Sequence, residues 1–427
     1  MNIFIILMVC IIPIIIAFFF SNIFIYFSLF IGHFPISLRE SILTPFGNLH
    51  ISSIKLFGIL LGSFLINMIH IGAIYKYFIR YRYHFFFLIF CTISLLWTPS
   101  LTYGIRMLAK LSAPLFFLLS IMALISKKNH LRWMENIILI SGVLVFLTAI
   151  FTKLAGLNPK FNLTIPGESP AVFTSHLLVV GMIAFVNIKY SNHLRNTILF
   201  IIFAIGILWG FTRITIAGMF IGLSIILFIS TRGIFRILLP STGLISFILL
   251  FFISEKFKER MFLTAAKKIT LLTFINDPIE TISHIAGSGR FAAWNYILKR
   301  FFNPNPIIGS GIGATQDYFY SSSPSGLGVI HSEYIRLISE IGIVGLIFFV
   351  ILALFYLIIL IHNYKSALSI EAKKYALAGI GGLVGYLIFM ATDNAFDYFN
   401  TFALFIFSLI AMSEKTIELE KLERNKY

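Results

Sequence analysis

The chain has 427 residues, of which 59% are hydrophobic and only 12% are charged, and its formal net charge is +16. Soluble domains contain about 25% charged residues, so this composition, with a mean hydropathy of +0.95, excludes a soluble globular protein. The basic residues occur in scattered pairs and triplets rather than in one basic domain. This pattern argues against nucleic-acid binding and favours contact with anionic membrane lipids.

Apolar runs recur along the sequence, and a helix needs about 20 residues to cross a bilayer. The first run, 3–31, lacks the small-residue cleavage site of a signal peptide and is kept as a span. The other runs lie near 56–75, 85–97, 105–125, 136–154, 171–187, 197–210, 214–230, 234–253, 341–361, 375–391 and 398–412. They do not alternate in polarity as barrel strands would. We therefore predict an all-α polytopic membrane protein with about twelve transmembrane helices.

The positions of lysine and arginine predict the topology, because short cytoplasmic loops collect these residues. With the N-terminus inside, the even-numbered loops and the C-terminal tail hold 17 of the 33 basic residues, against about seven in the short loops of the other side. The 17 are Lys76, Arg80, Arg82, Lys127, Lys128, Arg132, Lys189, Arg195, Arg232, Arg236, Lys365, Lys373, Lys374, Lys415, Lys421, Arg424 and Lys426. Both termini are therefore predicted to be cytoplasmic.

The chain is asymmetric, and we treat 1–427 as a single integral-membrane domain. Helices 1–9 are predicted within 1–253, a large periplasmic loop within 254–340, helices 10–12 within 341–412, and a cytoplasmic tail within 413–427. No internal duplication of the kind common in transporters is visible. Long loops in compact architectures are usually functional, so the chemistry is expected in 254–340.

The loop has distinct segments. Residues 255–268 have mixed charge and helical spacing of apolar residues, which predicts a short amphipathic helix. A second helix, with Trp294, Ile297 and Phe301 on one face, is predicted to follow Gly287-Ser-Gly-Arg290 and to stop at Asn303-Pro304. The stretch Gly309-Ser-Gly-Ile-Gly313 is too rich in turn residues for a regular helix. His331-Ser-Glu-Tyr334 is expected to open a helix that runs through Gly342 into the tenth span.

These residues resemble a known family. Four segments carry the resemblance. They are Thr212-Arg213, Gly287-Ser-Gly-Arg290 with Trp294, Pro306 before the Gly309–Gly313 turn, and His331-Ser-Glu-Tyr334 with Gly342-Ile-Val-Gly345. Together they resemble the O-antigen ligase and O-antigen polymerase superfamily over roughly 200–350, although Ser332 stands where the family more often has asparagine. The resemblance implies a glycosyltransferase of the bacterial inner membrane. Such an enzyme takes a glycan from undecaprenyl pyrophosphate on the periplasmic face.

Arginine is the residue type suited to a pyrophosphate, because its guanidinium keeps its charge and binds two oxygens at once. Arg213 and Arg290 are the main candidates, and Arg290 opens a helix whose free N–H groups favour anions. The alternatives are an interfacial arginine at a span end for Arg213 and a solvated loop charge for Arg290. Arg336 is a weaker third candidate, since it is spaced to pair with Glu333 or Glu340 instead.

His331 is the predicted catalytic residue, acting as a general base on the acceptor hydroxyl, because an imidazole titrates near the working pH. It is the histidine that lies in an ordered motif on the outer side. The alternative is that it merely precedes Ser332, whose hydroxyl is suited to cap the helix.

Acidic and sulfur residues give no sign of a metal or another cofactor. There are four aspartates, Asp277, Asp317, Asp393 and Asp397, and none forms an Asp-x-Asp pair. Cys10 and Cys91 lie in predicted spans and form no CxxC pair. A metal-independent enzyme is therefore predicted. Asp393 and Asp397 share one helical face and either orient a sugar or cap helix ends.

Three functions remain open. An O-antigen ligase would transfer the glycan to a lipid A-core acceptor in lipopolysaccharide biosynthesis, and a surface-polysaccharide polymerase would transfer it to another glycan. A lipid-linked oligosaccharide flippase is disfavoured, because the spans read as nearly pure hydrocarbon. The sequence favours the ligase only slightly over the polymerase.

Overall fold

The structure is a computed structural model that describes residues 11–32, 41–44, 47–158, 162–166, 168–253, 290–321 and 329–425, with isolated residues between 254 and 289. Cys10, Gly287-Ser-Gly289 and most of the predicted helix at 255–268 lie outside these described residues. Statements below refer to the described part of the chain.

Helices occupy the described part of every apolar run predicted from the sequence. The helices before the long loop are α2 (Ile12–Phe19), α3 (Ser21–Gly32), α4 (Ile51–Ile69), α5 (Ile71–Arg80), α6 (Arg82–Ile93), η2 (Ser94–Trp97), α7 (Leu101–Leu124), α8 (Lys128–Leu154), α9 (Pro170–Tyr190), α10 (His193–Gly210), α11 (Arg213–Ser230) and α12 (Phe235–Ile253). They are followed by α16 (Arg290–Ile297), η4 (Leu298–Phe302), α17 (Ala314–Ser321), α18 (Glu333–Ser366), α19 (Ile370–Phe389), η5 (Ala395–Tyr398), η6 (Phe399–Ala403) and α20 (Leu404–Arg424). The helical fold is therefore confirmed.

One element departs from the all-α prediction. Strands β1 (Ser41–Thr44) and β2 (Gly47–His50) pair antiparallel, with Ser41 opposite His50 and Thr44 opposite Gly47. They join α3 to α4. The run of turn-forming and polar residues here is too short to give a sequence pattern that separates a hairpin from a plain loop.

Seven of the described helices are long and apolar enough to cross a membrane, or eight if the α4–α5 pair, bent by 107°, is one span. The seven are α7, α8, α9, α10, α11, α18 and the segment Ala395–Arg424. At several other predicted spans the helix is short or interrupted, as where Phe20 separates α2 from α3. The protein is thus a multi-pass membrane protein, and the count of twelve spans stays a prediction.

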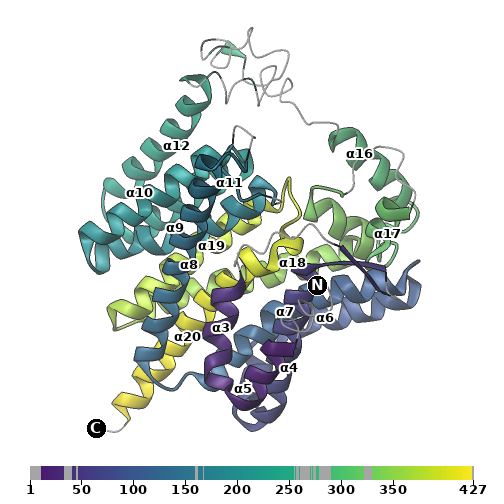
Figure 1. Cartoon of the computed structure of the whole chain (residues 1–427), viewed down its shortest axis with the longest axis horizontal. Helices are drawn as coiled ribbons and strands as arrows, with labels where there is room; N and C mark the ends of the chain where they lie inside the picture. Colours follow the sequence, from purple (N-terminus) through teal and green to yellow (C-terminus); the bar gives the residue numbers. More distant parts are fainter. Residues whose placement is uncertain are drawn as a thin grey trace.

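Burial separates the central helices from the peripheral ones. The apolar windows of α9 and of Ala395–Arg424 are 83% and 89% buried, whereas that of α10 is only 28% buried. In Figure 1, α20 crosses the bundle toward the C-terminus, while α10 and α12 lie on its outer flank. Exposed faces of the peripheral helices carry large apolar side chains such as Ile201 and Ile205, as expected for surfaces in contact with lipid.

The basic residues of the predicted cytoplasmic loops gather at one end of the bundle, where they pair with carboxylates of α8, α19 and α20. The ion pairs are Lys76–Glu418, Arg80–Glu414, Lys128–Glu423, Arg132–Glu371 and Lys374–Glu135. Loops that the charge pattern assigned to one side therefore do lie together in space.

Helix α18 contains the main correction to the predicted elements. It does not run regularly through Gly342, because the φ of 66° and ψ of −169° at this residue break the helix. The loop 306–313 supplies hydrogen-bond partners to the backbone groups at the break. Ile343 and Val344 donate their N–H groups to the carbonyl oxygens of Pro306 and Ile307, at 2.9 and 3.1 Å.

The carbonyl groups on the N-terminal side of the break also accept hydrogen bonds from this loop. The N–H groups of Ser310 and Gly311 bind the carbonyl oxygens of Ser339 and Glu340, at 3.0 and 2.8 Å. Gly309, Gly311 and Gly313 all have left-handed backbone conformations, with φ between 71° and 92°. The irregular structure predicted for this stretch is confirmed, and its role is to supply hydrogen bonds that the broken helix lacks.

Candidate functional site

The site is built around the turn that joins α19 to η5, residues 390–394. Asp393 is 6% exposed, and its Oδ1 accepts hydrogen bonds from the Asn394 N–H at 2.8 Å and from the Tyr398 hydroxyl at 3.1 Å. Asn394 directly precedes helix η5 and makes no side-chain cap hydrogen bond. The capping role that the sequence left open for Asp393 and Asp397 is therefore not seen, and both carboxylates instead face other side chains of the site.

His331 lies against this turn. Its Nδ1 is 3.7 Å from Asp393 Oδ1, and its side chain is 26% exposed, so the imidazole is partly accessible. The backbone of His331 has a φ of 52°, which non-glycine residues rarely adopt. Such strain costs about 1–3 kcal/mol and persists where the surroundings impose it, commonly at functional sites.

Three successive residues anchor the backbone at this position. The Trp294 indole N–H donates to the Ile330 carbonyl oxygen at 2.7 Å, and the His331 N–H donates to Asn394 Oδ1 at 3.0 Å. Ser332 caps α18 by accepting from the Ile335 N–H at 3.3 Å, as the sequence predicted. The spacing of the Arg290-x-x-x-Trp294 segment thus serves to hold the histidine loop.

Arg290 begins α16 and reaches the same turn. Its Nη1 donates to the carbonyl oxygen of Thr392 at 2.7 Å, next to Asp393. The residue is only partly buried, so it remains accessible at the edge of the site. His331 and Arg290, which are 41 positions apart, are therefore both in contact with residues 392–394.

Arg336 has a different environment, because it is only 2% exposed. Its guanidinium lies 3.1 Å from Glu333 Oε2 and 3.5 Å from Asp397 Oδ2, and its Nη2 donates to Asn394 Oδ1 at 3.4 Å. The pairing with Glu333 predicted from the spacing is present, and it is buried. Arg336 is thus engaged by protein groups on several sides.

Lys110 of α7 completes this buried network through an ion pair with Asp397. Its side chain is 13% exposed. Glu333 also accepts a hydrogen bond from the Phe396 N–H at 2.9 Å, so α7, α18 and η5 are joined by charged groups. The spans are therefore not pure hydrocarbon. The sequence does not predict this polar network, because a single lysine within an apolar run forms no recognisable pattern.

Arg213 is brought to the same end of the bundle by the packing of α11 on α19. A Cβ on Gly218 would lie 3.3 Å from Gly385 Cα, and one on Gly222 would lie 2.8 Å from Gly381 O. The two helices thus run antiparallel, so Arg213, at the start of α11, lies toward the end of α19 that leads into the turn. The structure gathers Arg290, His331 and Arg336 directly and puts Arg213 on the neighbouring helix end.

The glycine loop is tied to the site helix by Glu340, which is 2% exposed. Its carboxylate accepts the N–H groups of Gly313 and Thr315, at 2.8 and 3.2 Å, and the Thr315 hydroxyl. Glu340 therefore has a structural role that the spacing with Arg336 did not reveal. Among the described residues, no group of three or more His, Cys, Asp or Glu side chains is arranged to hold a metal ion.

Comparison with known proteins relates the central segment of the chain to a family. Residues 198–350 match the family model described as O-antigen ligase, a segment that contains Arg213, Arg290, His331 and Arg336. The chain is also similar to the teichuronic acid biosynthesis protein TuaE of Bacillus subtilis (strain 168), with 22% identity over 91% of this chain and 80% of that protein. The resemblance inferred from the motifs is confirmed by the match of residues 198–350 of this multi-pass membrane protein to the O-antigen ligase family model.

Proposed function

We propose that the protein is a membrane glycosyltransferase that transfers a glycan from undecaprenyl pyrophosphate to a hydroxyl group of an acceptor. The observation that carries the proposal is the convergence of His331, Asp393 and Arg290 on the 390–394 turn, within a chain whose central segment matches the O-antigen ligase family. In this proposal the chain has about twelve spans, the site faces the periplasm of a bacterial inner membrane, and both termini are cytoplasmic.

The proposed base is His331. Its Nδ1 faces Asp393, which favours the imidazole with Nε2 free to accept the acceptor's hydroxyl proton. As that proton moves to His331, the hydroxyl oxygen forms a bond to the anomeric carbon. The bond from that carbon to the pyrophosphate oxygen breaks, and its electron pair leaves with undecaprenyl pyrophosphate. Asp393 would stabilise the imidazolium that results.

The proposed pyrophosphate ligands are Arg290 and Arg213. Arg290 uses Nη1 for Thr392, which fixes the guanidinium while leaving other N–H groups for phosphate oxygens. Arg336 is the least available of the three arginines proposed from the sequence, because Glu333, Asp397 and Asn394 engage it. We assign it, with Lys110, to keeping the turn in place and adding positive potential behind it.

The acceptor proposed first is lipid A-core, which makes the protein an O-antigen ligase of lipopolysaccharide biosynthesis. The name of the matched family supports this choice. A second candidate is a surface-polysaccharide polymerase that uses a glycan as the acceptor. It is favoured by the similarity to a protein named for teichuronic acid biosynthesis, a polysaccharide other than O-antigen.

A deletion strain distinguishes the two acceptors. Loss of a ligase leaves bare core on lipopolysaccharide gels while long glycan accumulates on the carrier lipid. Loss of an O-antigen polymerase leaves core that bears one repeat unit, and loss of a polymerase for another surface polysaccharide leaves the gel unchanged while single repeat units accumulate on the carrier lipid. An unchanged gel and an unchanged carrier-lipid pool would contradict both. Transfer from purified undecaprenyl-pyrophosphate glycan, measured with and without a chelator, tests the proposed independence of metal ions.

A further inference from the structure

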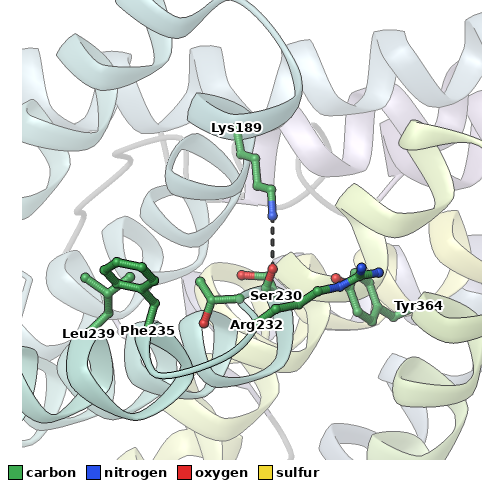
Figure 2. Close-up of a pocket in the computed structure, with 7 residues that line it drawn as sticks. Lys189, Ser230, Arg232, Phe235, Leu239 and Tyr364 are labelled. Carbon is green, nitrogen blue, oxygen red and sulfur yellow. Dashed lines mark hydrogen bonds between the residues drawn. The ribbon is translucent and has the colours of Figure 1, made fainter.

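A pocket lies at the opposite end of the bundle from the site. It has a volume of about 560 Å³ and is formed where α9, α11, α12 and α18 meet, with Lys189, Ser230, Arg232, Phe235 and Tyr364 among its lining residues. Figure 2 shows Lys189 and Arg232 entering it from different elements. Because α11 rises about 1.5 Å per residue from Arg213 to Ser230, roughly 25 Å separates this pocket from the site.

Charge is the first property of the pocket. Lys189 Nζ donates to the carbonyl oxygen of Ser230 at 3.0 Å, drawn as the dashed line in Figure 2. Within the described part of the chain, neither Lys189 nor Arg232 forms an ion pair, whereas Lys76, Arg80 and Arg132 at the same end do. The two pocket cations thus keep uncompensated charge that an anion can neutralise.

An apolar groove continues from this pocket. It has a volume of about 340 Å³, runs between α9 and α11 past Phe185, Ile188, Ile226 and Leu227, and shares Lys189 and Ser230 with the pocket. The groove lies along two helices that are long and apolar enough to cross a membrane. Its occupant therefore needs an apolar chain that starts beside the two cations.

We propose that this end of the bundle binds an anionic phospholipid, with its phosphate between Lys189 and Arg232 and an acyl chain in the α9–α11 groove. Basic pockets between transmembrane helices are suited to such headgroups. Phe235 is 58% exposed beside the cations, a position typical of aromatic side chains at the level of lipid headgroups. The site is independent of the glycosyltransferase proposal, since it shares no residue with the 390–394 turn.

The test uses the full chain, purified in detergent and stripped of lipid, with bound lipid counted by native mass spectrometry. Phosphatidylglycerol should bind more tightly than phosphatidylethanolamine. Arg232→Gln and Lys189→Gln should each lower the affinity for phosphatidylglycerol about fivefold, and the double variant about 25-fold, since a basic residue near the headgroups contributes about 1 kcal/mol. Both positions are exposed, so melting temperatures of the three variants should match the parent.

Arg236→Gln is the matched control, because Arg236 lies in the first turn of α12 but is not among the residues that line the pocket, and its Cζ sits 4.1 Å from the Phe228 ring centroid. It should change the affinity less than twofold. An equal loss in Arg236→Gln, or equal binding of the two lipids, would overturn the proposal. Leu227→Trp should lower lipid binding by filling the groove. If inorganic phosphate displaced the lipid at the concentrations at which the lipid itself binds, the pocket would be a site for free anions. That result would overturn the lipid assignment.

Discussion

At His331 the backbone is held in a left-handed conformation by contacts on both sides, and the side chain faces a buried carboxylate. A histidine that only opened a helix would not need this conformation, since Ser332 already provides the cap. The strain therefore favours a role for the imidazole itself.

Replacing His331 with asparagine tests that role. Asparagine tolerates the left-handed conformation and retains hydrogen bonding, but it has no useful basicity. Turnover in transfer from purified donor should fall roughly 10²- to 10⁴-fold, the range for loss of a general base, while the amount of protein in the membrane stays unchanged. His362→Asn, an exposed change in the last turns of α18, is the control and should keep full turnover. Near-parental turnover in His331→Asn would remove His331 from the mechanism.

Arg290→Lys tests the proposed grip on pyrophosphate. Lysine keeps the charge but loses the planar fork and the fixed contact with Thr392. We expect kcat/KM for the donor to fall roughly 10- to 100-fold, the equivalent of one charge-assisted hydrogen bond. Arg300→Lys, on the neighbouring segment beside Tyr318, should behave like the parent. If Arg290→Lys supports full transfer, the proposal that Arg290 binds two pyrophosphate oxygens at once is wrong.

How much of the site the sequence predicts depends on whether a residue belongs to an ordered motif. Arg290 and His331 were found because their neighbours, glycines and Trp294, give a pattern over short spacing. Lys110 and Asn394 were missed, since each is a single polar residue whose partner is far along the chain. Asp393 was noticed, but its partner His331 is 62 positions away, and only the fold brings the two together.

Among the elements, α18 shows best what hydropathy predicts and what it does not. The apolar run correctly indicated a helix, but a hydropathy pattern is insensitive to the single residue at which a helix breaks. The break at Gly342 depends on hydrogen bonds with the loop 306–313, a segment whose position the sequence does not specify. The bend between α4 and α5 was missed for the same reason.

Gly342→Ala should therefore damage the fold near the site. A Cβ at this position would overlap the Ile307 backbone, and the φ of 66° disfavours alanine. We expect the free energy of unfolding to drop by roughly 1–3 kcal/mol or more, seen as a lower melting temperature in detergent. Gly72→Ala, in α5 with open space around the Cβ, should be neutral or slightly stabilising. Equal stability of Gly342→Ala and the parent would contradict the described break.

For the whole molecule, the charge pattern predicts on which side of the membrane each loop lies. The ion pairs of α20 show that the predicted cytoplasmic loops lie at one end of the helical bundle. Cysteines at Asn305 and Ser191, both exposed, test the orientation in a background without Cys10 and Cys91. In intact spheroplasts an impermeant maleimide should label position 305 and not 191, and permeabilised cells should label both. Labelling of both positions in intact spheroplasts would rule out the proposed topology.

The central place of α20 has a consequence for how the protein is made. It follows every other described helix in the chain, yet the segment that contains it, Ala395–Arg424, is the most enclosed of the candidate spans. The earlier helices leave the ribosome and enter the membrane before α20, which packs against α7 and α19, exists. The bundle therefore remains open during synthesis and closes late, when Asp397 meets Lys110 and Glu414 meets Arg80. A chain arrested before residue 395 would lack α20 and Asp397 and would leave Arg80 and Lys110 without these partners, and we expect membrane quality-control proteases to recognise it.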